Sequence, residues 1–241
     1  KPSSPRLGIV FICVTILIDT IGFGIIIPVM PDLIRELTET DLSGAAMYGG
    51  ILLFLYAFIQ FFAAPVLGNL SDRFGRRPVL IISLLAFGID YALMGLAPNI
   101  VWLFIGRALA GVFGATFATA NAFIAYISPP ETRAKNFGVM GAAWGIGFIM
   151  GPVIGGFLGE YGPRVPFFAA AAIAVLNAIY GYFILPETLK PEDRRPFQFS
   201  RSHPLVALTQ MRQYPAVFGL FLVVSLYQIA HDANPSVFSY F

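Results

Sequence analysis

The sequence predicts an all-α membrane protein, built as a six-helix bundle followed by the start of a seventh helix. Hydrophobic residues make up 57% of the 241-residue chain, and only 12% of its residues are charged. A soluble domain carries about 25% charged residues, and the mean hydropathy of this chain is +0.77. Apolar stretches of roughly 20 residues, each long enough to cross a bilayer core, recur between short polar segments. Lys and Arg are concentrated in alternate polar segments, as in polytopic helical proteins.

Seven spans are expected along the chain. The first continues past Asp19 without a small-residue cleavage site, so it is interpreted as a retained helix and not as a signal peptide. The longest polar stretch follows the sixth span and is rich in Pro, Arg and Glu, so we expect a cytoplasmic linker there, with a surface helix around Val206–Arg212. The chain then divides into a six-helix bundle (1–185), the linker (186–214) and the start of a second bundle (215–241). The expected spans are Leu7–Met30, Tyr48–Leu67, Val79–Ala97, Ile100–Ile127, Phe137–Leu158, Pro166–Leu185 and Pro215–Tyr240.

Positive charge predicts the orientation. With a cytoplasmic N-terminus, twelve Lys and Arg residues fall in cytoplasmic segments, while Arg35 and Arg164 fall outside and Arg107 lies within a span. The positive-inside rule therefore favours a cytoplasmic N-terminus. The single cysteine, Cys13, excludes an internal disulfide and a multi-cysteine metal site. We expect it to pack as a small apolar residue.

A charged segment of eleven residues separates the second and third spans. It reads Gly68-Asn69-Leu70-Ser71-Asp72-Arg73-Phe74-Gly75-Arg76-Arg77-Pro78. The segment is too short and too basic for a domain linker, so we expect a tight cytoplasmic turn. Asp72 is expected to pair with the neighbouring arginines and to cap a nearby helix terminus in one access state. A hairpin rich in Gly and Arg also occurs in other polytopic proteins.

The fifth span carries a glycine repeat of period four. Its members line one helix face, which allows another backbone to approach closely. Pro152, within the repeat, frees a backbone carbonyl and bends the helix. Glycine spacing alone indicates helix packing and nothing more. The repeat consists of Gly147, Gly151, Gly155 and Gly159.

Three charged residues, Asp19, Asp90 and Arg107, lie inside predicted spans. A charge within the bilayer is costly unless it is paired or hydrated, so each is a functional candidate. With a helical rise of about 1.5 Å per residue, all three lie roughly 18–20 Å from the cytoplasmic edge. Two interpretations stay open: a structural ion pair with a spare proton, and a protonatable cluster that lines a water-filled cavity.

Several of these patterns resemble a known family. The Gly-x-x-x-Asp-Arg-x-Gly-Arg-Arg pattern resembles the signature loop of the major facilitator superfamily, and the Gly-Pro-x-x-Gly-Gly core at Gly151–Gly156 resembles the motif of its antiporters. Further stretches, which cover nearly all of the first six spans, resemble the tetracycline/proton antiporters of Gram-negative bacteria. These stretches are Ile18–Gly24, Pro28–Pro31, Tyr48–Leu52, Ala64–Gly68, Asp90-Tyr91, Arg107–Gly111 and Pro166–Ala170.

The resemblance implies a proton-coupled efflux antiporter that exports an amphipathic, tetracycline-like drug. Asp19, Asp90 and Arg107 match charged positions important for transport. The gating loop is matched by Gly68, Asp72, Arg73, Gly75, Arg76 and Arg77, and the antiporter helix by Gly147, Gly151, Pro152, Gly155 and Gly156. Expected cavity residues are Gln60, Asn121, Gln228, His231, Asp232 and Asn234. His231 fits either a proton relay or a hydrogen-bonded cavity histidine.

The resemblance also implies the surroundings of the chain. Such folds pair two six-helix halves around a substrate held near the midplane. We therefore expect a second half to complete this chain, and the present chain alone not to transport. The other expected partners are membrane lipid, protons and a small-molecule drug that can travel as a cation chelate, all in the bacterial inner membrane. No cofactor, metal or nucleic acid is expected.

Other functions are weighed against this one. A multidrug or metabolite exporter of the same fold remains an alternative. A passive channel is disfavoured by the antiporter-like helix and the gating loop. An intramembrane enzyme is disfavoured because the sequence carries no HExxH motif, Ser/Lys dyad or metal-ligand cluster, and it has no ATP-binding P-loop.

Overall fold

A computed structural model describes residues 5–114, 116–197, 204, 206, 209 and 213–233 of the chain. Within these ranges the elements are helical, and six of the helices are long and apolar enough to cross a membrane. The chain is therefore a multi-pass membrane protein. Its elements are α1 (Pro5–Ile26), α2 (Met30–Thr38), α3 (Leu42–Phe74), α4 (Arg76–Gly95), α5 (Ile100–Phe113), α6 (Thr116–Ile127), α7 (Pro130–Gly159), α8 (Val165–Ile184), the 3-10 turn η1 (Pro191–Asp193) and α10 (Pro215–Ala233).

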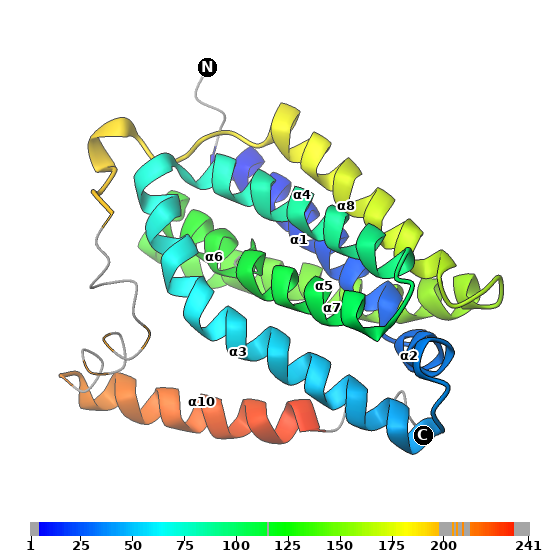
Figure 1. Cartoon of the computed structure of the whole chain (residues 1–241). Coiled ribbons are helices and arrows are strands. Elements are labelled where there is room, and N and C mark those ends of the chain that lie inside the picture. Colours follow the sequence, from blue (N-terminus) through cyan, green and yellow to red (C-terminus); the bar gives the residue numbers. More distant parts are fainter. Residues whose placement is uncertain are drawn as a thin grey trace.

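The long helices form a bundle with α1 at its centre (Figure 1). α1 packs against α6, α7 and α8, while α4 packs against α5 and α8, and α3 lies along α5. α10 lies to one side of this bundle (Figure 1). Helices α1, α4, α6 and α8 therefore surround a common interior, and this arrangement positions the charged residues of the spans.

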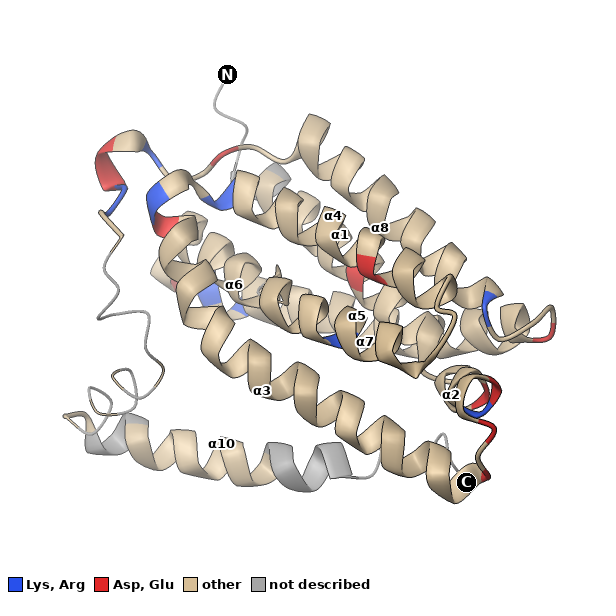
Figure 2. Ribbon diagram, viewed as in Figure 1, with Lys and Arg blue, Asp and Glu red and all other residues tan. Residues whose placement is uncertain are grey.

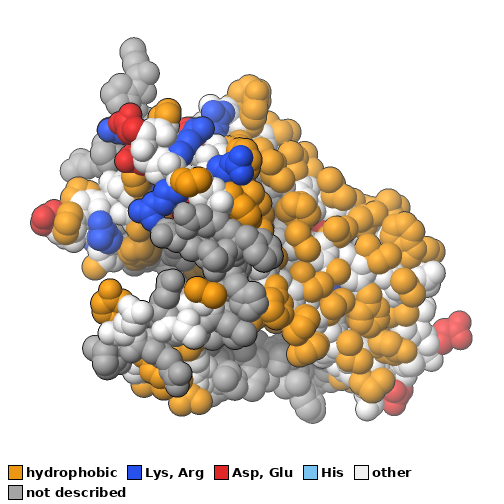
Figure 3. Space-filling model, turned by 60° about the vertical axis from the view of Figure 1, so that its left-hand side comes forward, with side chains coloured by type: hydrophobic (Ala, Val, Ile, Leu, Met, Phe, Trp, Pro, Cys, Tyr) orange, Lys and Arg blue, Asp and Glu red, His pale blue; other side chains and the backbone are white. Residues whose placement is uncertain are grey.

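Charged side chains gather at the two ends of the bundle, with few between them (Figure 2). We call the end where α1 begins the basic end, and the other the α2 end. The basic end carries the junctions of α3 with α4 and of α6 with α7, and the segment after α8. Its Lys and Arg residues are Arg73, Arg76, Arg77, Arg133, Lys135, Lys190, Arg194 and Arg195. Between the ends, hydrophobic side chains cover a broad face, as expected of a surface in contact with lipid (Figure 3).

The interior contains two apolar clusters. The basic-end cluster joins α1, α4, α6, α7 and α8 and includes Ile12, Leu80 and Phe123. The α2-end cluster joins α1, α2, α3, α4, α5 and α8 and includes Tyr91 and Phe167. Burial of these side chains fixes the four central helices relative to one another.

Six of the predicted spans are present, and α3 and α7 extend beyond their predicted bounds at both ends. The predicted span Ile100–Ile127 is confirmed with the same bounds, but it consists of two helices, α5 and α6, with a turn at Gly114. The carbonyl of Gly114 accepts a hydrogen bond of 2.7 Å from Nε2 of Gln60 on α3. A side chain therefore satisfies the backbone at the break, which hydropathy cannot reveal.

A further difference is α2, which the sequence does not predict. Pro28 has no backbone N–H to continue α1, which ends at Ile26. Pro31 then lies in the first turn of α2, where its missing donor costs nothing. Leu33 and Ile34 of this helix are buried in the α2-end cluster.

The seventh predicted span is described only in part. Helix α10 forms over Pro215–Ala233, which agrees with the predicted start. The side chains of Gln228, His231 and Asp232, and Asn234 as a whole, lie outside the described residues, as does most of the expected surface helix around Val206–Arg212. The roles predicted for those four polar residues stay predictions.

Candidate functional site: a buried ion pair and its surroundings

A buried ion pair lies in the middle of the bundle. Nη2 of Arg107 on α5 is 2.9 Å from Oδ2 of Asp90 on α4. Asp90 is 0% exposed and Arg107 is 4% exposed. Two charges in such a setting stabilise each other, but removing either partner leaves the other buried and unpaired. The structure thus brings together two of the three charged residues that the sequence placed at similar depth.

Gly106 makes room for the carboxylate of Asp90. A methyl group on Gly106 would lie 2.5 Å from Oδ1 of Asp90 and 2.8 Å from Cγ of Met94. Oδ1 has no hydrogen-bond partner in the described part of the chain. One oxygen of Asp90 is therefore bound to Arg107, while the other is enclosed and unpaired.

Tyr56 on α3, which the sequence analysis did not single out, flanks the ion pair. The guanidinium carbon of Arg107 lies 5.8 Å from the centre of the Tyr56 ring, within the range of a cation–π contact. Nε2 of Gln60 donates to the Tyr56 hydroxyl at 3.0 Å and also to Gly114. The predicted cavity residue Gln60 thus connects the arginine site to the break in the fourth span.

Asp19 on α1 is half-buried. It forms no hydrogen bond or salt bridge with another residue in the described ranges. It interacts electrostatically with Tyr56 and Tyr91, which also interact with Asp90 and Arg107. The three charged groups thus share two phenolic neighbours, and Asp19 is the one without a counter-ion. Asn121, the other predicted cavity residue, is half-buried on α6.

The glycine repeat of α7 packs directly on α1. A methyl group on Gly151 would lie 2.6 Å from Cα of Gly24, and one on Gly147 would lie 2.8 Å from the carbonyl oxygen of Leu17. Gly155 meets the backbone of Ile25 in the same way. Gly156 has no atom within 4 Å of such a methyl group, so it lies off the packing face. Pro152 adjoins the contact, because a methyl group on Gly24 would lie 3.0 Å from its Cδ.

The predicted gating loop consists mostly of helix. α3 continues through Gly68 and Asp72 to Phe74, and α4 begins at Arg76, so Gly75 alone separates the two helices. Gly75 has φ +108°, a conformation that favours glycine. The predicted turn is therefore present and is tighter than the eleven-residue segment suggested, because most of that segment forms the ends of two abutting helices.

Asp72 is expected to cap a neighbouring helix, and the structure gives that role to Glu187. Oε1 of Glu187 accepts from the backbone N–H of Arg76 at 3.1 Å, and Oε2 accepts from that of Arg77 at 3.3 Å. Asp72 instead lies 3.9 Å from Nη2 of Arg76, which confirms a pairing with one of the arginines. Asp72 lies in the last turn of α3, and its contact with α4 is to the side chain of Arg76.

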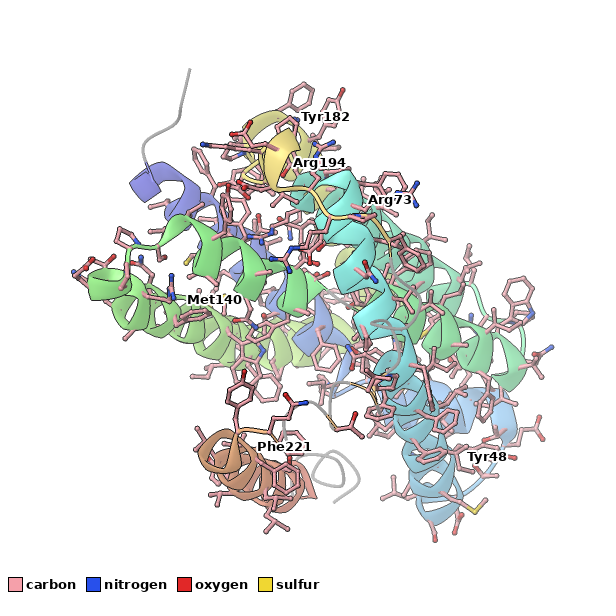
Figure 4. All side chains as sticks on the ribbon, turned by 90° about the vertical axis from the view of Figure 1, so that its left-hand side faces the viewer. Tyr48, Arg73, Met140, Tyr182, Arg194 and Phe221 are labelled. Carbon is pink, nitrogen blue, oxygen red and sulfur yellow. The ribbon has the colours of Figure 1, made fainter. Side chains whose placement is uncertain are left out.

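The segment that follows α8 crosses the basic end and contacts three other elements. We call residues 185–195 the strap. The backbone N–H of Arg195 donates to the carbonyl of Asp72 at 3.1 Å, and the hydroxyl of Tyr126 on α6 donates to Asp193. Figure 4 shows Arg73, Tyr182 and Arg194 gathered at this end. The glutamate shortly after the sixth span was a sequence signal for the strap, but the helix that it caps could not be predicted from it.

Comparisons with known proteins agree with this architecture. Residues 12–241 match the family model described as Major Facilitator Superfamily. The chain is 43% identical over 222 residues to tetracycline resistance protein, class C, of Escherichia coli, covering 92% of this chain and 55% of the relative. It is 34% identical over 228 residues to multidrug resistance protein 2 of Bacillus subtilis, covering 94% and 56%. The chain spans about half the length of the curated relatives it matches.

Two solved structures share the fold. The crystal structure of the human organic anion transporter MFSD10 has a TM-score of 0.74 and 23% identity, covering 86% of this chain and 55% of that one. A bacterial homolog of the human lysosomal transporter Spinster, inward-facing and unoccupied, has a TM-score of 0.70 and 17% identity, covering 99% and 55%. At these identities the likeness concerns the fold alone.

Proposed function

The chain belongs to the major facilitator superfamily, and we propose that it forms one half of a proton-coupled efflux antiporter for an amphipathic, tetracycline-like drug. The observation that carries the proposal is the buried Asp90–Arg107 pair with the unpaired carboxylate of Asp19 near it. Relatives named for tetracycline resistance support the choice of drug.

The charges of this site suit an exchange of a proton for a drug. With both acids ionised, two carboxylates and one guanidinium sum to one negative charge (−2 + 1 = −1). Inside a membrane an uncompensated charge is costly, so the site favours one added positive charge. A proton can supply it, and so can a drug that travels as a cation chelate. The proton and the drug cation compete to neutralise the same negative charge, so binding of one releases the other. Antiport requires this competition.

The strap and the junction at Gly75 supply a structure for gating. Asp72, Arg76 and Glu187 are held together at the basic end. The proposed orientation places this end in the cytoplasm, because it carries most of the Lys and Arg residues. We assign the protein to the bacterial inner membrane, in contact with lipid, with a second six-helix half enclosing the substrate. The proton gradient drives the proposed transport, and no cofactor is required.

A multidrug exporter is the second candidate. It is favoured by the similarity to multidrug resistance protein 2 over 94% of this chain. In that case Asp19 would accept organic cations of several shapes and not one metal-chelated drug. Competition by an organic cation against tetracycline uptake separates the two candidates.

The test uses everted membrane vesicles that contain the complete transporter. An imposed pH gradient, acid inside, should drive tetracycline uptake into these vesicles. Asp90→Asn should abolish uphill uptake while energy-independent exchange of labelled tetracycline survives, because the neutral side chain no longer couples proton to drug. Absence of pH-driven uptake by the unaltered transporter, or full uptake by Asp90→Asn and Asp19→Asn, would reject the proposal.

A further inference from the structure

We propose that the bundle binds internal water among its two apolar clusters, held by polar side chains of α4, α6 and α8, and that this water relays the proton that Asp90 releases to the water at the basic end. The second part of this inference rests on the proposed function, whereas the first concerns the folded protein alone. We call these polar residues the polar belt. They are Ser83, Asp90, Thr116, Thr119 and Asn177.

Each residue of the polar belt carries a buried oxygen without a partner. Asp90 and Asn177 are 0% exposed, Ser83 is 1% exposed, and Thr116 and Thr119 are each 2% exposed. Within the part of the chain that the structure describes, no hydrogen bond is made by Oγ of Ser83, Oγ1 of either threonine, Oδ1 of Asn177 or Oδ1 of Asp90. Almost all buried polar groups in proteins pair with protein or with water, so five such oxygens on helices that pack on one another indicate water.

The residues of the belt come from helices that pack on one another. α4 contacts α6 and α8, and α1 contacts both α6 and α8. Nδ2 of Asn177 donates to the carbonyl of Thr15 on α1 at 2.9 Å. This bond holds the amide beside α1, one helical turn from Asp19 toward the basic end. Ser83 precedes Asp90 by seven residues, so it lies on the same face of α4, about 10 Å nearer the basic end.

On α6 and α8 the belt lies at the boundary between the two apolar clusters, whereas on α4 Ser83 lies within the basic-end cluster and Asp90 within the α2-end cluster. On α6, Thr116 and Thr119 precede Ala120, the first residue of the basic-end cluster on that helix. On α8, Asn177 falls between Ala174 of one cluster and Ala178 of the other. Apolar side chains therefore enclose the polar groups from both ends, which would confine a small number of water molecules.

Water fits the chemistry of the belt better than another ligand does. The hydroxyl groups can each donate and accept, and the amide and carboxylate oxygens accept, which is the mixture that a water molecule bonds to. An apolar molecule would leave every one of these atoms unpaired. A metal ion is not favoured, because the described residues hold no group of three His, Cys, Asp or Glu side chains.

The charged and titratable groups around the belt define its role. Arg107 on α5 and the phenols of Tyr56 and Tyr91 interact with Asp90, and Asp19 on α1 interacts with the same two phenols. Cys13 lies on α1 in the basic-end cluster. Ser83 and Asn177 are neutral and extend from Asp90 toward the basic end. A proton leaving Asp90 toward that end therefore meets neutral hydrogen-bonding groups first.

The basic-end cluster prevents a continuous leak. Ile12, Leu80 and Phe123 are each at most 1% exposed and lie between the belt and the basic end. The proton stays on Asp90 until these side chains separate, and the water in the belt then connects the carboxyl group to the water at the basic end, which accepts the proton. In the proposed orientation that end faces the cytoplasm, where an antiporter driven by the gradient releases its proton.

The experiment removes two hydroxyl groups while conserving shape, with the variant Ser83→Ala/Thr119→Val in the complete transporter. We expect pH-driven tetracycline uptake by everted vesicles to fall about tenfold, the factor that corresponds to roughly one lost hydrogen bond. Exchange without a gradient should stay unchanged. Thr119→Ser should retain uptake because it keeps the hydroxyl. Thr20→Val is the matched control, since the Thr20 hydroxyl is already bonded to the carbonyl of Ile16 at 2.7 Å.

Hydroxyl-radical footprinting of the purified transporter tests the water directly. Phe123 and Phe167 are 1% and 0% exposed, so bulk solvent reaches neither. Phe123 is one turn from Thr119, and we expect radicals formed from bound water to modify it several-fold more than Phe167. The double variant should abolish the difference. Equal modification of the two phenylalanines would overturn the water site, and pH-driven uptake unaffected by the double variant would overturn its role in proton release.

Discussion

Gly106 is the residue on which the geometry of the ion pair depends most directly. Gly106→Ala would place a methyl group 2.5 Å from Oδ1 of Asp90 and 2.8 Å from Met94. Overpacking of this kind costs about 1–3 kcal/mol, and relief requires Asp90 to move away from Arg107. We expect a lower unfolding temperature in detergent and a marked loss of pH-driven uptake.

A second glycine provides the matched control for this prediction. A methyl group on Gly141 of α7 would meet no atom within 4 Å, so Gly141→Ala should leave both the unfolding temperature and the uptake rate near those of the unaltered protein. If Gly106→Ala behaved like Gly141→Ala, the carboxylate of Asp90 would have room that the structure does not show.

Among the helices, α4 has its first turn capped by Glu187, a residue more than a hundred positions away in the sequence. Glu187 accepts from the backbone N–H groups of Arg76, Arg77 and Leu189, and its negative charge opposes the positive end of the helix dipole. Glu187→Gln keeps the size but removes the charge and one acceptor. We expect a loss of roughly 1 kcal/mol of stability and slower transport, with tetracycline affinity within a few-fold.

Glu192→Gln is the control for this change. Glu192 lies in the same strap, but its 3.6 Å contact with Lys190 joins two exposed side chains, and such pairs contribute little. Thermal unfolding in detergent and equilibrium drug binding separate the two variants. A Glu187→Gln protein with normal stability and turnover would show that the cap is dispensable.

The sequence predicted those features that depend on one element at a time. Hydropathy located six spans, and helical rise placed Asp90 and Arg107 at one depth, where they form their pair. The period-four glycines likewise predicted a close helix contact. In each case the physical cause is local to a helix, so a single sequence contains it.

Features that depend on two distant segments were missed. The turn at Gly75 appeared longer than it is, because a helix end capped by Glu187 has no local signature. The division at Gly114 depends on Gln60 in another helix. Tyr56 and Asn177 looked like ordinary residues of apolar spans, and only their neighbours in the fold distinguish them.

For the whole molecule, the distribution of charge predicts which way the bundle faces. Single cysteines would be introduced into a transporter otherwise free of cysteine, at Ala134 near the start of α7 and at Tyr161 in the turn after it. Both positions are exposed. A membrane-impermeant maleimide should label Tyr161→Cys in intact spheroplasts and Ala134→Cys only after permeabilisation. The reverse labelling would place the basic end outside the cell and contradict the proposed direction of proton release.

The glycine repeat between α7 and α1 also bears on how the molecule can move. Gly147, Gly151 and Gly155 present nearly the same surface every four residues, a spacing of about 6 Å along the helix axis. Displacing α7 by one such step would set another glycine against Gly24. The two helices therefore meet through a repeated narrow surface and not through interlocked large side chains, so we expect this contact to tolerate a shift along the helix axis.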